Sequence, residues 1–326
     1  MEKSIRPKVV ISKCLGFEAC RYNGEMISDN FVKSLEPFVE FIFVCPEVEI
    51  GLGTPRAPVK LVSTNINPAD CSLIQPATDR DLSVKMKSFS KTFFKSLSDI
   101  DGFILKSASP SCGVKDARYY KTKEKGPAFK KGPGMFASAV LKEFPDTVIE
   151  DEGRLTNLHL REHFLTRIFT FTRFKILKKS PSMHKMVQFQ KTHKLLLLSY
   201  NQKELKNLGK IVANHDKEPL KNIIELYERH LSKALTRVPR RRSNINVLMH
   251  ALGYVSPQLI SSEKAFFLDI LERYRKHQVP LSTPIEVLQS WLIRFDVQYL
   301  LNQAYFEPFP QDLISLQDSA KSHRKI

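Results

Sequence analysis

Short apolar runs alternate with helix-compatible stretches through the first half of the chain. The runs KVVIS (8–12), VEFIFV (39–44) and GFILK (102–106) are rich in β-branched and aromatic residues, as strands are. Residues 31–38 and 83–97 instead carry apolar residues at helical spacing. This order predicts an α/β N-terminal domain, Rossmann-like, with a mostly parallel sheet.

The second half of the chain has a different pattern from about residue 155 onward, with long amphipathic stretches and few β-branched runs. It predicts an all-α C-terminal domain. The basic Ser-Pro segment KKSPSMHK (178–185) interrupts the helical periodicity. We therefore expect a first domain over 1–155, a helical connector over 156–184 and a basic helical domain over 185–326. The predicted helices cover residues 155–177, 183–200, 205–213, 220–235, 245–254, 263–277 and 284–293.

Composition indicates the compartment in which the protein works. The chain has 326 residues, 42% of them hydrophobic, and five cysteines. No apolar run approaches the roughly 18 residues of a membrane span, and the first residues, MEKSIRPKVV, lack the pattern of a signal peptide. We expect a soluble, cytoplasmic protein that does not contact the membrane. In that compartment the thiols would be free, catalytic or metal-bound rather than paired in disulfides.

Charge is distributed unevenly along the chain. The formal net charge is +17, with 22 Lys and Arg against 18 Asp and Glu in residues 1–150 and 29 against 16 in the remainder. The excess of +13 in the second part predicts that this part binds a polyanion such as a nucleic acid. A solvated basic surface is the alternative.

Three of the cysteines follow the three predicted strands. Cys14, Cys45 and Cys112 lie at or just beyond a strand's carboxyl end, the third within ILKSASPSCG (104–113). In an open parallel sheet these ends face one crevice, so the three thiols are expected to converge there. The alternative is that each cysteine is a small buried hydrophobic residue.

Three thiolates without a fourth partner restrict the metal chemistry. Structural zinc takes four ligands, commonly in Cys-x-x-Cys pairs, and no such pair occurs here. Three cysteines suit an iron–sulfur cluster with one iron open to substrate. Cys20 and Cys71 do not end strands, and we do not expect them to be ligands.

Polar residues near these cysteines are candidates for the chemistry. Glu47 could act as an acid–base group or accept a hydrogen bond from a base edge, or it could be a solvated carboxylate. The hydroxyls of Ser109 and Ser111 could donate to a bound carbonyl, or could merely form the turn. The sequence does not decide which serine faces a substrate.

The motifs VISKCLGFEACRYNG, CPEVEIGLGTPR and LKSASPSCG resemble those of the thiouracil desulfidase family, over about residues 6–150. The resemblance implies that Cys14, Cys45 and Cys112 hold a 4Fe-4S cluster whose remaining iron captures the sulfur of a thiocarbonyl, which oxygen from water replaces. It assigns functional roles to Glu47 and to Ser109 or Ser111. Asn23 stands where many members have Asp, and Ile50-Gly51 where many have Gly-Gly.

Residues 185–312 resemble the helical module of two-domain members, in FQKTHKLLLLSYN, LGKIVAN, NINVLMHALGY, VPLSTPIEVL and YLLNQAYFEPFP. The resemblance implies the branch that converts 4-thiouridine in tRNA to uridine, and so a tRNA partner. The candidates for contact with RNA are the run RVPRRRSN (237–244) and the pair His193-Lys194. The basic residues that could bind phosphates are Arg237, Arg240, Arg241, Arg242 and Lys194. Asn244 and Asn246 could cap a helix that begins near Ile245.

Two other functions fit the same residues. An iron–sulfur sensor could bind nucleic acid without turnover, and a desulfidase could act on free thiouracil and use its helical domain for self-association. The sequence predicts no particular oligomeric state.

Overall fold

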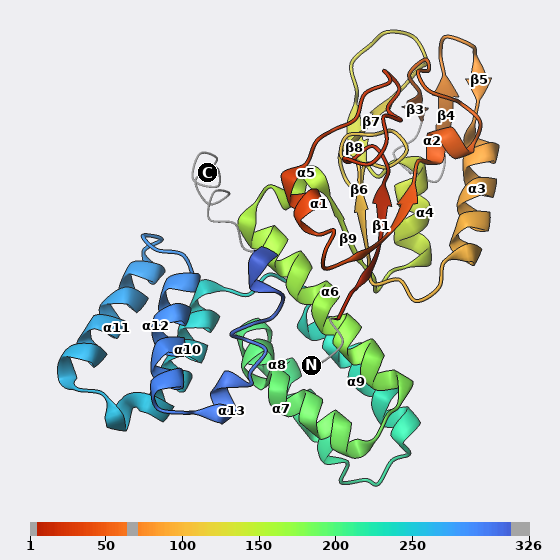
Figure 1. The fold of residues 1–326 in the computed structure, drawn as a ribbon. Helices are drawn as coiled ribbons and strands as arrows, with labels where there is room; N and C mark the ends of the chain where they lie inside the picture. The colour runs from red at the N-terminus through yellow and green to blue at the C-terminus, as the bar shows by residue number, and fades with distance from the viewer. Residues whose placement is uncertain (1–4, 64–70, 314–326) are drawn as a thin grey trace. The chain divides into compact units, whose positions relative to one another are not determined.

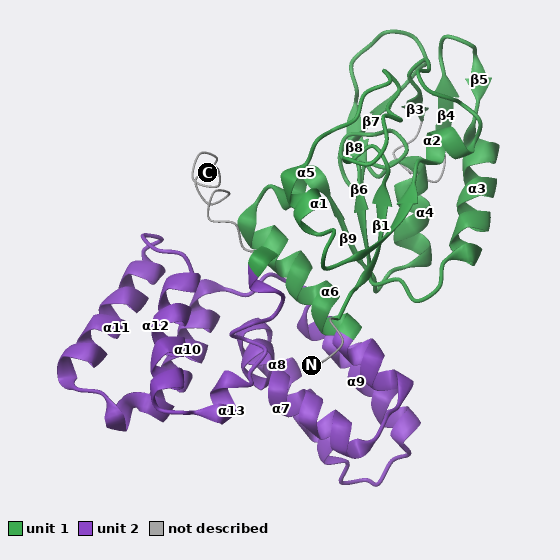
Figure 2. Cartoon of the chain, in the orientation of Figure 1, with its two compact units in different colours: residues 1–172, 312–326 green, residues 173–311 purple. Residues whose placement is uncertain are grey.

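The computed structural model describes residues 5–63 and 71–313. The chain divides into two compact units, residues 1–172 with 312–326, and residues 173–311 (Figure 2). The first unit is α/β and the second is helical, which confirms the fold class expected from the sequence. Among the described residues, no helix combines the length and the apolar character that a membrane span needs.

A four-stranded parallel sheet forms the centre of unit 1 (Figure 1). Its strand order is β2-β1-β6-β9, with all three neighbouring pairs parallel. The strands are β1 (Lys8–Ser12), β2 (Glu40–Val44), β6 (Gly102–Leu105) and β9 (Val148–Asp151). The first three fall within the predicted runs. The side chains of β1 and β6 are largely buried, whereas β2 lies at the edge of the sheet, with Phe43 exposed and Phe41 and Ile42 partly exposed.

Helices cover both faces of this sheet. Phe103 and Leu105 of β6 join a core that includes α3 (Ser83–Ser96) and α4 (Met135–Glu143). Gly102 points the other way, and a Cβ there would lie 3.2 Å from the side chain of Ile168 in α6 (Leu158–Lys179). The alternation along β6 therefore places α3 and α4 on one face and α6 on the other. Short helices complete the unit: α1 (Asn30–Ser34), α2 (Pro46–Glu49) and α5 (Glu152–Leu155).

A second sheet, absent from the sequence prediction, packs in the same core. It has five strands in the order β5-β4-β3-β7-β8, antiparallel except for the β3–β7 pair. Its strands have two to four residues, too short to show a hydrophobic period. They are β3 (Lys60–Val62), β4 (Ser72–Gln75), β5 (Arg80–Asp81), β7 (Ala117–Tyr120) and β8 (Lys130–Gly132).

Unit 2 is built from helices that match the predicted ones closely. The last turns of α6 belong to it, followed by α7 (Met183–Tyr200), α8 (Gln202–Ala213), α9 (Leu220–Ala234), α10 (Arg241–Val255), α11 (Ser261–Arg275), α12 (Ser282–Arg294) and α13 (Gln298–Leu301). Tyr305, Phe306 and Phe309 of the aromatic segment after α13 are buried. These rings therefore pack in the helical core.

Candidate active site

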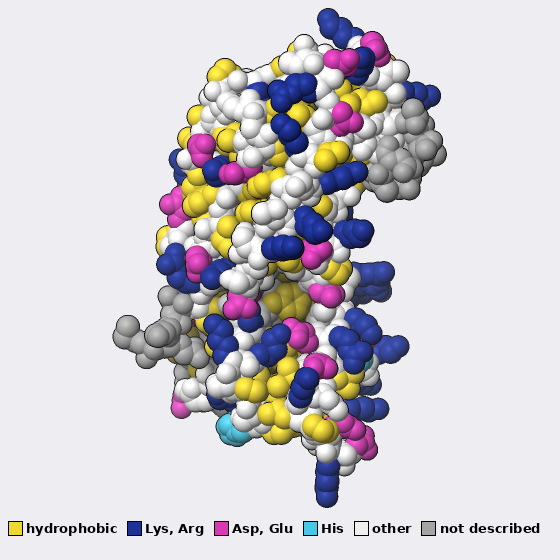
Figure 3. Space-filling model, turned by 90° about the vertical axis from the view of Figure 1, so that its right-hand side faces the viewer, with side chains coloured by type: hydrophobic (Ala, Val, Ile, Leu, Met, Phe, Trp, Pro, Cys, Tyr) yellow, Lys and Arg dark blue, Asp and Glu magenta, His cyan; other side chains and the backbone are white. Residues whose placement is uncertain are grey.

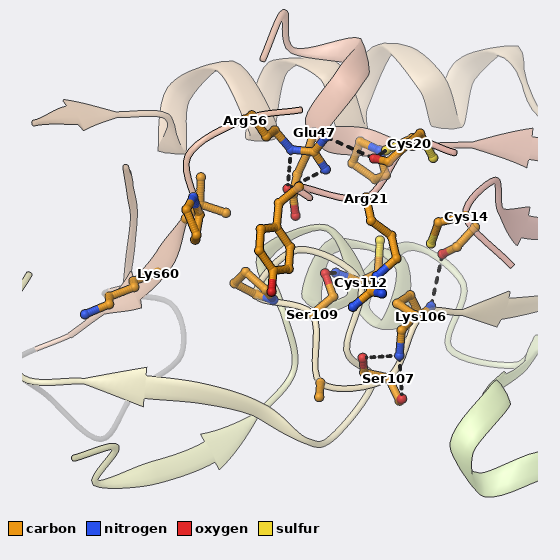
Figure 4. A pocket seen from close by; sticks show the side chains of 18 of the residues that line it. Cys14, Cys20, Arg21, Glu47, Arg56, Lys60, Lys106, Ser107, Ser109 and Cys112 are labelled. Carbon is orange, nitrogen blue, oxygen red and sulfur yellow. Dashed lines mark hydrogen bonds and ion pairs between the residues drawn. The ribbon is translucent and has the colours of Figure 1, made fainter. Parts of the chain in front are cut away.

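A cavity of about 430 Å³ opens at the carboxyl ends of β1, β2 and β6. Ser12, Val44 and Lys106, which end or directly follow these strands, all line it. This is where a parallel sheet places ligands, because the loops that follow its strands diverge there. Figure 4 shows the side chains that surround the cavity.

The cavity brings together the three cysteines expected to converge. Cys14, Cys45 and Cys112 all line it, and each is less than a tenth exposed. Cys20 lines it as well, although we did not expect it to be a ligand. The thiols of Cys14 and Cys45 are close enough to shift the pKa of its thiol, and Cys45 Sγ lies 3.8 Å from its carbonyl oxygen. Cys71 lies elsewhere, in the hydrophobic core that includes Leu61 and Leu73.

Crowding and burial keep the thiols of Cys20, Cys45 and Cys112 protonated in the absence of a cation. The neighbouring thiol of Cys14 raises the pKa of Cys20 to about 11, with burial adding to the effect. The Cys20 thiol and burial raise the pKa of Cys45 far above its ordinary value, and burial together with Cys45 does the same to the pKa of Cys112. A bound metal group would reverse these shifts, since a coordinating thiol is deprotonated by the cation.

Glu47 is the buried carboxylate of the site. Its Oε2 lies 2.8 Å from Nε and from Nη2 of Arg56, and Ser111 Oγ donates to its Oε1 at 2.9 Å. Arg56 also donates through Nη1 to the carbonyls of Cys20 and Gly53, both at 2.9 Å. One guanidinium therefore ties the carboxylate to the loop that carries Cys20. Arg56 lies at the end of the motif CPEVEIGLGTPR, but the sequence gives no signal of this role.

The structure separates the two candidate serines. Ser111 is fully buried and donates its proton to Glu47. Ser109 lines the cavity, and its Oγ accepts from the backbone N–H groups of Ser111 and Cys112, at 3.2 and 3.0 Å. Because Ser109 Oγ already accepts two hydrogen bonds, its own proton can be donated, either to the neighbouring Cys112 thiol or into the cavity.

The third cysteine is held by the N-terminus of α4. Gly134 N–H donates to the Gly113 carbonyl at 2.7 Å, and Ala137 N–H donates to the Ser111 carbonyl at 3.0 Å. A Cβ on Gly134 would lie 2.5 Å from the Ser111 carbonyl oxygen, so only glycine allows this approach. Close packing of the Gly134 backbone against the Ser111 carbonyl therefore fixes the loop that carries Cys112.

Basic and aromatic residues surround the thiols and Glu47. Lys106 lines the cavity, but its Nζ lies 2.5 Å from Glu152 Oε1, which offsets its positive charge. Lys13, which directly follows β1, pairs with Glu18 and Glu49 at 3.5 Å. Sequence reasoning missed the remaining members because they come from separate loops and from the second sheet: Arg21, Tyr22, Lys60, Arg118 and Tyr120.

The thiols that line the cavity are donors of the kind that iron–sulfur clusters use. Within residues 5–63 and 71–313, no group of three or more His, Cys, Asp or Glu side chains is arranged to hold one metal ion. Four thiols instead surround a cavity, and thiolates are the usual ligands of iron–sulfur clusters. The residues present fit a 4Fe-4S cluster in donor chemistry and in the room that the cavity offers.

The basic residues proposed for RNA contact differ in their surroundings. Arg237, Arg240 and Arg242 are exposed, as is Lys194 on α7. Arg241 is engaged within unit 2: it donates to the Tyr274 carbonyl at 2.6 Å and lies over the Tyr274 ring at 4.5 Å. Lys and Arg side chains are scattered over the face drawn in Figure 3, with Asp and Glu among them.

Two expectations in this region are wrong. His193, considered with Lys194 for RNA contact, is 2% exposed and stacks on Phe189, with ring centroids 3.9 Å apart. Burial lowers the pKa of His193 to about 3. Asn244 does not cap a helix, because α10 already begins at Arg241; its side chain is buried and bonds to the hydroxyls of Tyr274 and Tyr305.

Comparisons with known proteins agree with the division of the chain. Residues 9–152 match the family model described as 2-thiouracil desulfurase, and residues 194–310 match a protein family of unknown function, DUF1722. A solved structure, that of TudS, a [4Fe-4S]-dependent thiouracil desulfidase, is 25% identical with a TM-score of 0.35 and covers 46% of this chain and 93% of its own.

Two curated relatives are described as uncharacterized. YbgA of Escherichia coli K12 is 28% identical over 181 residues, which cover 55% of this chain and 97% of YbgA. YbbK of Bacillus subtilis 168 is 27% identical over 109 residues, which cover 32% of this chain and 72% of YbbK. Residues 9–152 of this chain are therefore similar to the 2-thiouracil desulfurase family, and residues 194–310 are similar to a family described as of unknown function.

Proposed function

We propose that this protein is an iron–sulfur-dependent desulfidase that converts 4-thiouridine in tRNA to uridine and releases sulfide. The observation that carries the proposal is the shared cavity. Three strand-end cysteines, Glu47 and Ser109 line it, within the domain that matches the 2-thiouracil desulfurase family. The reaction exchanges a C=S bond for C=O with one water molecule, so atoms and electrons balance without an external redox partner.

Cys14, Cys45 and Cys112 would hold the 4Fe-4S cluster through their thiolates. When bound, the cluster supplies a Lewis-acidic iron that attracts the soft thiocarbonyl sulfur of the substrate. The loop that carries Cys112 is fixed by α4, while Cys45 directly precedes α2 and Cys14 follows β1. The three thiols are therefore anchored on separate rigid elements around the cavity.

Glu47 would act on the attacking water. Its carboxylate is fixed from two sides by Arg56 and Ser111, so it is held in one orientation at the wall of the cavity. A carboxylate so placed can take a proton from water that attacks the carbon of the thiocarbonyl, or accept a hydrogen bond from the ring N–H of the base. Both roles require that it stays in place during turnover.

Ser109 would donate its hydroxyl proton to the pyrimidine or to its sulfur. Ser111 would be a positioning residue, because its proton is already donated to Glu47 and its side chain is fully buried. The structure thus supports Ser109 as the catalytic serine, a choice that the sequence left open.

Charge supports tRNA as the substrate. Residues 173–311 carry 23 Lys and Arg against 11 Asp and Glu, a formal net charge of +12. Binding of a phosphate backbone needs such an excess, because each neutralised phosphate releases counterions. Within unit 1, Arg118 is exposed at the cavity and Tyr22 is 45% exposed there. A flipped nucleotide could therefore meet an aromatic ring and a guanidinium beside the thiols.

The test is sulfide release by anaerobically reconstituted protein. Wild-type protein should release sulfide from tRNA that contains 4-thiouridine, and Cys45→Ala should not. Tight tRNA binding without turnover would support a sensor instead. Turnover of free thiouracil that equals or exceeds that of tRNA would favour the free base as substrate. Sulfide release that does not depend on the cluster would contradict the mechanism.

A further inference from the structure

Cys20 is the one thiol of the cavity to which the proposed reaction gives no task. It is 1% exposed and lines the cavity with Cys14, Cys45 and Cys112. Cys45 Sγ lies 3.8 Å from its carbonyl oxygen, and the thiols of Cys14 and Cys45 are its interacting side-chain neighbours. Four thiols thus gather at a site whose proposed cluster needs three. Figure 4 shows the sulfurs of Cys20 and Cys14 on the same side of the cavity.

Cys71 shows what an inert cysteine looks like in this protein. It is buried in an apolar core beside Leu61 and Leu73, and it does not line the cavity. Cys20 lines the cavity, where its neighbours are the thiols of other cysteines. Filling of an apolar core therefore explains Cys71 but not Cys20.

The backbone of Cys20 is held in place independently of its thiol. Its carbonyl accepts a hydrogen bond from Arg56 Nη1 at 2.9 Å and a longer contact from Cys45 Sγ at 3.8 Å. Its N–H donates to the Glu18 carbonyl at 2.8 Å. The turn that returns the chain to the cavity six residues after Cys14 contains Gly16, whose φ of +99° favours glycine. The loop thus presents this thiol at the site with a fixed backbone.

We propose that Cys20 is an exchangeable fourth ligand. In the substrate-free protein its thiolate binds the iron that Cys14, Cys45 and Cys112 do not hold, and the substrate's sulfur displaces it. The inference rests on the proposed cluster and goes beyond its three expected ligands. Binding breaks the S–H bond of Cys20 and forms an iron–sulfur bond, with the proton passing to solvent. Displacement reverses both changes, so no electrons are gained or lost.

This role has a physical rationale. An iron with no protein ligand in a cavity open to solvent is the iron most easily lost or attacked by oxidants. A thiolate that occupies it between turnovers protects the cluster. The same thiolate competes with the substrate, so that apparent affinity falls in proportion to the fraction of protein in which the iron is open.

The experiment measures the loss of iron from the full-length protein, reconstituted anaerobically and then treated with ferricyanide. Wild type, Cys20→Ser, Cys20→Ala and Cys71→Ala are compared by iron content and by the EPR signal of a three-iron cluster. Cys71→Ala is the matched control, since it also removes a buried thiol but not one at the cavity. Both Cys20 variants should form the three-iron signal at least about tenfold faster than wild type and the control.

A second readout is substrate binding, measured as the change in cluster absorption when 4-thiouridine monophosphate is added. Cys20→Ser lacks the competing thiolate. If the iron is open in about a tenth of wild-type molecules, this variant should bind 4-thiouridine monophosphate about tenfold more tightly than wild type does. Equal rates of iron loss in wild type and Cys20→Ser would overturn the inference. So would a Cys20→Ser protein that assembles no cluster, because Cys20 would then be an essential ligand and not an exchangeable one.

Failure of the proposed function looks different. If wild type itself assembles no four-iron cluster, or if Cys14→Ala assembles one as well as wild type does, the proposed three-cysteine ligand set is wrong. The inference about Cys20 falls with it. If wild type and Cys71→Ala hold the cluster and only the Cys20 comparison fails, the proposed function stands and the fourth ligand is rejected.

Discussion

The hydroxyl of Ser111 donates a hydrogen bond to Oε1 of Glu47 at 2.9 Å, across 64 residues of sequence. Both side chains are buried. The contact joins the loop that carries Cys112 to the short helix that follows Cys45. It couples the position of the carboxylate to the position of two of the thiols, and it distinguishes the roles of the two neighbouring serines.

Replacing each serine by alanine should therefore give different kinetics. Ser109→Ala removes a group proposed to touch substrate and should mainly lower kcat. Ser111→Ala leaves Glu47 in place but short of one charge-assisted hydrogen bond, and should lower kcat/KM by about tenfold to a hundredfold. Sulfide release from 4-thiouridine monophosphate measures both. Full activity of Ser109→Ala would contradict its assignment.

Arg56→Gln should destabilise the protein strongly. It removes the ion pair at 2.8 Å from a buried carboxylate and two hydrogen bonds to loop carbonyls. Leaving a buried charge without its partner costs about 3–5 kcal/mol in the free energy of unfolding. Because the second change removes the stranded charge, the double variant Arg56→Gln/Glu47→Gln should recover part of that loss. Urea unfolding of the wild type, both single variants and the double variant, all without the cluster, measures this double-mutant cycle. Strictly additive losses in the free energy of unfolding would contradict the coupling between Arg56 and Glu47.

Gly134→Ala should disturb the loop that carries Cys112. The added methyl group would lie 2.5 Å from the Ser111 carbonyl oxygen. Because its neighbours are backbone atoms of Ser111 and Pro110, they cannot move away without distorting the loop. Gly126→Ala is the matched control, since nothing lies within 4 Å of a Cβ there. Thermal unfolding should show a lower Tm for Gly134→Ala only. Cluster assembly should fall in the same variant, and equal behaviour of the two variants would exclude this packing constraint.

Asp151 makes the stability of unit 1 depend on pH. Burial, opposed in part by the Arg154 N–H and reinforced by nearby carboxylates, raises the pKa of Asp151 to about 6. A carboxyl whose pKa is higher in the folded state than in the unfolded state stabilises the folded protein most when it is protonated. The contribution of Asp151 to folding stability is therefore lost as pH rises from about 4 through 6. Asp151→Asn keeps the cap of α5 and removes the charge.

This variant should therefore be more stable than wild type at pH 8, by up to about 3 kcal/mol, with a smaller difference at pH 5. Urea unfolding at the two pH values measures the effect within one pair of proteins. A difference of the same size at both pH values would show that the carboxyl of Asp151 does not titrate in this range.

Arginines of unit 2 should separate into binding and structural residues. Arg242 is exposed, so Arg242→Gln should weaken tRNA binding and, if it meets a phosphate, reduce the salt slope of log K by about 0.9. Arg241→Gln should instead lower the Tm, because it loses the contacts with Tyr274. Lys85→Gln, a change of the same charge on α3, serves as control. An unchanged salt slope for Arg242→Gln would remove it from the RNA-binding surface.

The local pattern of the sequence determined the elements that are long enough to show a period. The strand KVVIS and the helix over Met183–Tyr200 appear in the structure with the predicted bounds. The position of three cysteines after strands also predicted their convergence, because parallel strands bring their carboxyl ends to one edge. Composition and charge predicted the contrast between the two halves of the chain.

Tertiary structure decided what the sequence left open. The second sheet has strands of two to four residues, whose pairing depends on partners distant in the chain. Cys20 follows no strand, yet a turn and a contact with Arg56 bring it to the cavity. Ser109 and Ser111 have the same chemistry and lie two residues apart. Only the fold directs one hydroxyl to Glu47 and leaves the other facing the cavity, because the direction of a side chain depends on backbone geometry and on the groups packed around it.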